Sequence, residues 1–180
     1  MKNGALDEND QMPEIIKKYV RGIDAVNRVV GLFSMYLIFV MMGILFYSSI
    51  SKTFFHPSLW TLEMAQFTMA AYYLLGGGYS MQLQSHVRMD LFYGNWSPRT
   101  RAIVDSFTVV TLIIYLLFLL YGAYSSTSYS LKYGEVSNSA WAPYLAPIKL
   151  IMSLGIFLML LQTIAAFFRN IAEATGKEIS

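Results

Sequence analysis

Few side chains in this sequence have the types and spacing that chemistry requires. His86 and Asp90 lie four residues apart, but a metal site needs a third or fourth ligand, which the sequence does not supply. A haem site would need two histidines close together, but the second histidine of the chain, His56, is separated from His86 by an apolar segment. The chain also has no cysteine, no phosphate-binding glycine loop and no nucleophile beside a base. We therefore expect no enzymatic activity, cofactor, metal or nucleic-acid partner.

Two charged residues, Glu63 and Lys149, lie at the ends of apolar segments, where an ionisable side chain is a candidate for function. Glu63 lies at the end of its segment and not at mid-depth, which favours a structural contact over a proton relay. Three roles suit Lys149. Its amine could snorkel outward, bind a lipid headgroup, or pair with Glu63 or Glu135, and snorkelling is the simplest of these.

The composition indicates which kind of secondary structure carries Glu63 and Lys149. Of 180 residues 56% are hydrophobic, 16% aromatic and only 13% charged, far from the average for soluble proteins. Four segments carry no charge: 29–51, 64–85, 106–131 and 150–168. A bilayer core needs about 20 helical residues, and the short alternating segments of a barrel are absent. The acidic start and the long first segment also argue against a cleaved signal peptide.

We therefore predict an all-α membrane protein whose transmembrane domain spans 29–168. Its four transmembrane helices should cover about 29–51, 61–85, 98–126 and 144–168. With four crossings, the two ends of the chain and the central loop share one side, which carries ten Lys and Arg residues against three on the other. The excess of positive charge places that side in the cytoplasm, with both termini inside.

The regions outside the transmembrane domain are short. Residues 1–12 are polar and acidic and form a flexible tail, and 169–180 form a cytoplasmic C-terminal tail. Residues 13–28 carry apolar side chains on one helical face and Lys and Arg on the other. Such a helix often lies at the cytoplasmic interface against lipid headgroups. A straight extension of the first transmembrane helix explains the pattern equally well.

The second predicted helix is the least lipid-like of the four. Trp60 anchors its start at the outer interface. Polar and small residues then recur at helical spacing: Glu63, Gln66, Ala70, Tyr73, Gly77, Ser80 and Gln84. Lipid offers polar groups no hydrogen bond, so this stripe should face protein. The glycine run 76–78 indicates close helix packing or local flexibility.

At these residues the sequence resembles the DctQ-like small membrane subunit of tripartite ATP-independent periplasmic (TRAP) transporters. That family has a tryptophan and an acidic residue at the start of helix 2, followed by a histidine-containing motif that ends in aspartate. The matching positions here are Trp60, Glu63, His86, Arg88, Asp90, Ser97, Pro98 and Arg101, with Trp141–Pro147 opening helix 4. The sequence departs from the family pattern at Gln84 and Ser85, which replace the usual glycine or charged residue, and at Lys149, which replaces an apolar one.

The resemblance implies a scaffold subunit in the bacterial inner membrane, beside a large membrane subunit that carries the transport sites. Such systems take up organic acids from a periplasmic binding protein, usually with sodium. The residues leave two alternatives open. A homodimeric four-helix exporter would need a carboxylate at mid-depth, and a membrane anchor of another complex would need cofactor ligands or a docking surface.

Overall fold

The computed structural model describes residues 14–83 and 98–175, and in these ranges the chain forms four helices. Their bounds are Glu14–Phe54 for α1, Thr61–Gln82 for α2, Pro98–Tyr133 for α4 and Ala146–Thr175 for α5. The described residues contain no strand, only an isolated bridge between Val136 and Tyr144 in the loop from α4 to α5. The predicted all-α class is confirmed for this part of the chain.

Three of the described helices are long and apolar enough to cross a membrane: α1, the part of α4 from Phe107 to Tyr133, and α5 up to Ala172. This supports the prediction of a membrane protein. α2 has 22 residues, about 33 Å at 1.5 Å per residue, so its length also suits a bilayer. It is less apolar because glutamine, tyrosine and glycine interrupt its hydrophobic residues. A fourth crossing by α2 stays a prediction.

α1 is one continuous helix from Glu14 to Phe54. The predicted interfacial helix 13–28 is therefore not separate from the first transmembrane helix, because residues 14–28 form the beginning of α1. Its first turns pack against the end of α5. Val20 is buried there, and the Tyr19 hydroxyl donates a hydrogen bond to the Leu161 carbonyl at 3.3 Å. This geometry is the straight extension that the sequence left open. A headgroup position for this stretch stays a prediction.

The later helices run further than the apolar segments alone indicate. α4 continues past residue 126 because its last turns find polar partners on α5. The Thr127 hydroxyl lies 3.3 Å from the Lys149 carbonyl and 2.9 Å from the Ser153 hydroxyl. Ser130, one turn later, is fully buried. The helix ends at Tyr133 and is followed by Gly134, whose φ of 61° is the left-handed conformation common directly after a helix.

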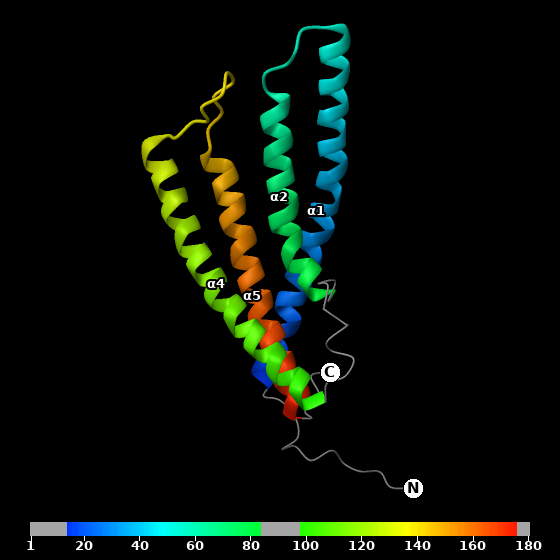
Figure 1. Ribbon diagram of the computed structural model, residues 1–180, viewed down its shortest axis with the longest axis vertical. Coiled ribbons are helices and arrows are strands. Elements are labelled where there is room, and N and C mark those ends of the chain that lie inside the picture. Colours follow the sequence, from blue (N-terminus) through cyan, green and yellow to red (C-terminus); the bar gives the residue numbers. More distant parts are fainter. Residues whose placement is uncertain (1–13, 84–97, 176–180) are drawn as a thin grey trace.

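The four helices form a row in the order α4, α5, α2, α1 and do not close into a ring (Figure 1). Among the described helices, α4 packs extensively against α5 alone, and α5 packs in turn against α2. Glycine permits the close approach of these two central helices, since a Cβ on Gly155 would lie only 2.8 Å from the backbone of Leu74. The outer faces of the row are consequently not covered by any other described helix.

The row is tight at one end and open at the other. α1 begins and α5 ends at the tight end, and the two hairpins diverge toward the loops that join their helices (Figure 1). Leu116, Ile156 and Leu160 form an apolar core between α4 and α5. Toward the loops, an apolar cleft of 560 Å³ separates α2 from α5 and is covered by loop residues that include Trp141. The loop end is thus the less densely packed part of the fold.

Candidate functional site

The predicted polar stripe on α2 divides into two groups in the structure. Gln66 is exposed and Tyr73 is 62% exposed, so both point away from the other described helices. Glu63 is only 8% exposed, and Gly77 lies against Met159 of α5, whose sulfur would be 2.8 Å from a Cβ. The chain itself therefore covers Glu63 and packs against one side of Gly77. The surface at Gln66 and Tyr73 has no cover from another helix among the described residues.

A shallow groove continues this surface toward the tight end of the row. Its volume is 370 Å³, and α1, α2 and Met159 line it. Small and aromatic side chains dominate the lining: Gly31, Ser34, Tyr72, Tyr73, Gly76, Gly77, Tyr79 and Ser80. Small residues on a helix surface let the backbone of another helix approach closely in a membrane. The groove and the exposed half of the stripe together form what we term the α2 face. Ala70, which is half-buried, lies between Gln66 and Tyr73 along α2.

Glu63 links the two hairpins at their loop ends. The Ser137 hydroxyl, in the loop between α4 and α5, donates a hydrogen bond to Glu63 Oε1 at 3.1 Å. The other oxygen, Oε2, is buried and has no hydrogen-bond partner among the described residues. Beside it, the fully buried Thr61 shares hydrogen bonds with the hydroxyls of Ser48 and Ser58. The start of α2 is therefore held by contacts from α1, from its own loop and from the opposite hairpin.

Lys149 forms an ion pair with Glu135, with 2.5 Å between Nζ and Oε2. Of the roles that the sequence left open for this lysine, the structure shows pairing with Glu135. The hydrogen bond from Lys149 is the main cause that lowers the pKa of Glu135 below its ordinary value. The charge of the lysine acts in the same direction, against partial desolvation. The pair fastens the loop to the first turn of α5.

A buried polar network joins α1 to α5 near the tight end, and the sequence analysis missed it. Asn27 Nδ2 donates a hydrogen bond to Gln162 Oε1 at 2.7 Å, and Gln162 Nε2 donates one to Asp24 Oδ1 at 2.9 Å. Asp24 also pairs with Arg169. Gln162 was the available signal, because an isolated amide in an apolar segment needs a protein partner. Its partner lies 135 residues away, which no local pattern indicates.

Asn27 also explains why α2 carries glycine at position 78. A Cβ on Gly78 would lie 2.4 Å from Asn27 Oδ1, an atom without a hydrogen-bond partner among the described residues. With Gly77 against Met159, two of the three consecutive glycines make close contacts with neighbouring helices. Close packing therefore accounts for these two glycines, as one of the two sequence interpretations proposed.

The comparison with protein families decides the identity of the chain. A family model described as "Tripartite ATP-independent periplasmic transporters, DctQ component" matches residues 25–173. The chain belongs to the DctQ family. The resemblance inferred from the motifs is confirmed. A search of curated proteins finds no match.

DctQ components are the small permease subunits of TRAP transporters, so this chain belongs to a family of membrane transport components and not to an enzyme family. The matched region contains all of α2, including the α2 face, and all of α4. It also contains Asn27, Gln162 and Arg169, whereas Asp24 precedes its first residue. The network that ties α1 to α5 thus uses one residue outside the family match.

Part of the DctQ motif cannot be placed in this geometry. Five predicted residues lie outside the described ranges: Gln84, His86, Arg88, Asp90 and Ser97. Pro98 is the first residue of α4, and Arg101 belongs to its first turns. Trp60 directly precedes α2 and stacks on Tyr47 of α1, with 5.7 Å between ring centroids. Within the described part of the chain, His, Asp and Glu form no group of three that could hold a metal ion.

Proposed function

We propose that this DctQ chain is the scaffold subunit of a TRAP-type secondary transporter and that it binds the large membrane subunit through its α2 face. The exposed amide of Gln66 carries the proposal. Gln66 lies about 8 Å along α2 from Thr61, at 1.5 Å per residue, which is within the apolar part of the helix. Hydrocarbon gives an amide no hydrogen bond, so a stable position for Gln66 requires another polypeptide.

The rest of the α2 face suits a transmembrane helix of that partner. Tyr73 offers a large aromatic surface and a hydroxyl, the combination that dominates the energy of many protein interfaces. Beside it the groove with Gly76 and Ser80 lets a helix approach closely. Family membership supplies the kind of partner, because a small permease subunit implies a large one. The open row of helices leaves this face accessible.

The remaining features of the proposal follow from the sequence and the family. The chain crosses the bacterial inner membrane four times with both termini in the cytoplasm, as the distribution of Lys and Arg indicates. The large subunit carries the substrate and sodium sites, and a periplasmic binding protein delivers an organic acid. This chain holds the static part of the assembly. Two of its own polar groups, the buried Glu63 and the half-buried Asp24, form hydrogen bonds within the chain.

The test compares two tyrosines of equal exposure on different helices. Tyr73 on α2 is 62% exposed and Tyr115 on α4 is 59% exposed. Tyr73→Ala should lower the amount of large subunit that co-purifies in mild detergent by about 5- to 30-fold, which corresponds to about 1–2 kcal/mol for an interface tyrosine. Gln66→Leu should act in the same direction. Tyr115→Ala should leave co-purification unchanged.

Two outcomes would contradict the proposal. Equal co-purification of the Tyr73→Ala, Tyr115→Ala and unchanged chains would mean that the α2 face is not the interface. Solute transport by this chain alone in liposomes would mean that it is a complete exporter and not a scaffold subunit. Near-complete loss of uptake on deletion of either subunit is the expected result in cells.

A further inference from the structure

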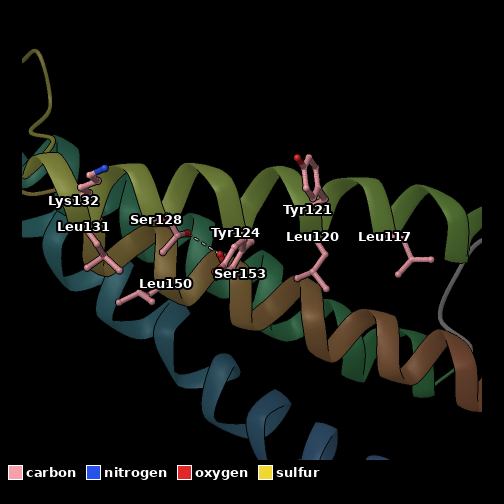
Figure 2. Close-up of a pocket in the computed structure, with 10 residues that line it drawn as sticks. Leu117, Leu120, Tyr121, Tyr124, Ser128, Leu131, Lys132, Leu150 and Ser153 are labelled. Atoms are coloured by element: carbon pink, nitrogen blue, oxygen red, sulfur yellow. Dashed lines mark hydrogen bonds between the residues drawn. The ribbon is translucent and has the colours of Figure 1, made fainter.

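A second groove lies on the other hairpin, along the seam of α4 and α5, and extends to the loop end (Figure 2). Its volume is 890 Å³. Leu117 lies at one end and Lys132 at the loop end, and the lining between them consists of leucine, tyrosine, threonine and serine side chains (Figure 2). α4 contributes the larger part of the lining, and Leu150 and Ser153 come from α5. The exposed surface of the groove is mainly apolar, and a charged side chain lies at its loop end.

The polar groups in the floor of the groove are already paired with one another. The hydroxyls of Thr127 and Ser153 lie 2.9 Å apart, and both also lie within hydrogen-bond distance of the Lys149 carbonyl. Hydrocarbon can cover such a floor without leaving these groups unsatisfied, because their hydrogen bonds are internal. The floor thus suits an apolar ligand.

The dimensions favour an extended ligand over a helix. Residues 117 to 132 span about 22 Å at 1.5 Å per residue. Divided over that length, the volume corresponds to a mean cross-section of about 40 Å², half of the roughly 80 Å² that a helix 10 Å wide requires. An acyl chain fits within this cross-section along the whole groove, whereas a transmembrane helix of a partner would lie over the groove and insert only its side chains.

The charge at the loop end identifies the ligand more closely. Lys132 is exposed, and its amine lies 5.5 Å from the ring centroid of Tyr133. The nearest acidic residue in sequence, Glu135, is engaged by Lys149, and no described carboxylate pairs with Lys132. The end of a spanning helix lies at headgroup depth, where a lysine attracts anionic lipid. A cation without a carboxylate partner in the described part of the chain, at the end of a mainly apolar groove, is complementary to a negative headgroup with attached tails.

We propose that this groove binds one anionic phospholipid of the surrounding membrane, with its headgroup at Lys132 and an acyl chain along Leu131, Leu120 and Leu117. In the topology proposed above, the lipid comes from the outer leaflet. The site depends only on α4 and α5 lying in a membrane, and not on the identity of the transported solute or on the presence of the large subunit.

The experiment uses the full chain, purified in mild detergent and titrated with phosphatidylglycerol or phosphatidylcholine, with bound lipid read by native mass spectrometry. The unchanged chain should prefer phosphatidylglycerol by about fivefold, which corresponds to about 1 kcal/mol for one lysine at the surface. Lys132→Gln should abolish the preference. Lys52→Gln is the matched control, because Lys52 is exposed at the end of α1, on the other hairpin, and should leave the preference intact.

A steric pair of variants tests the groove itself. Ser128 is exposed and lines the groove, whereas Ser125 is exposed and does not. Ser128→Trp should reduce binding of both lipids at least fivefold, and Ser125→Trp should not. Unchanged binding in Ser128→Trp, or an equal loss of preference in Lys52→Gln and Lys132→Gln, would overturn the proposal. So would a loss of the large subunit from Ser128→Trp with lipid binding unchanged, since the groove would then be a subunit interface.

Discussion

Gly155→Ala tests directly how α2 and α5 approach each other. The added Cβ would lie 2.8 Å from the carbonyl carbon and oxygen of Leu74 and 2.9 Å from its Cβ. Carbon atoms in ordinary contact are about 3.5–4.0 Å apart, so the two helices would have to separate by roughly 0.7–1 Å. Backbone atoms cannot rotate away as a side chain can. The whole contact between the hairpins would therefore have to shift.

The expected size of the effect follows from two opposing contributions. Overpacking of a well-packed contact costs about 1–3 kcal/mol. Alanine stabilises a helix by about 1 kcal/mol relative to glycine, which offsets part of that loss. Gly122→Ala on α4 is the matched control, because no atom lies within 4 Å of its added Cβ. The helix preference is the same in both variants, so Gly155→Ala should be less stable than Gly122→Ala by about 1–3 kcal/mol.

The measurement is the free energy of unfolding, obtained by titrating a denaturing detergent into the purified chain in mild-detergent micelles. Tryptophan fluorescence and helical circular dichroism should report the same transition in both variants. Free energies for Gly155→Ala and Gly122→Ala that agree within about 0.5 kcal/mol, the range of an ordinary surface substitution, would refute the reasoning. The close approach of α5 to Leu74 would then not hold the hairpins together.

Two further predictions concern the polar contacts of the fold. Gln162→Leu leaves the buried amide of Asn27 without its acceptor and should lower the free energy of unfolding by about 1–3 kcal/mol in the same titration; an unchanged value would contradict the network. Because the pKa of Glu135 is lowered in the folded loop, its pair with Lys149 stabilises the loop above the ordinary carboxyl pKa of 4.5 and is lost as the pH falls through the lower folded value. In a variant that keeps Trp141 as its sole tryptophan, a fluorescence change should mark the loss of the pair as the pH falls. Lys149→Met in that variant should move the midpoint of this change to higher pH. The same midpoint with and without Lys149 would mean that the pair does not stabilise the loop.

The helical class and the membrane setting could be predicted from the sequence, because both depend on local properties. A charge-free segment of about 20 residues can satisfy its backbone in lipid only as a helix or a closed barrel, whatever surrounds it. The family could also be predicted, since Trp60, Glu63 and the motif near His86 are short patterns in the chain. Pro98 opens α4 for a local reason as well, because the first turn does not use the missing N–H.

The division of the α2 stripe could not be predicted in this way. Helical spacing places Glu63, Gln66, Tyr73 and Gly77 on one face, but it does not say which neighbour covers that face. In the structure, Ser137 and Met159 reach Glu63 and Gly77, and nothing in the described part of the chain covers Gln66. The choice depends on where α5 and the loop before it lie, which is a property of the assembled row.

The partners of the isolated polar residues likewise depended on the tertiary structure. Lys149 had several acceptable partners in the sequence, and its pairing with Glu135 follows from the path of the loop between α4 and α5. Asn27 and Gln162 meet because Gly78 and Gly155 let α1, α2 and α5 come close together. Hydrophobic periodicity shows which side of a helix is apolar. Which helix lies against that side is decided by the fit of side chains and glycines between helices distant in the chain.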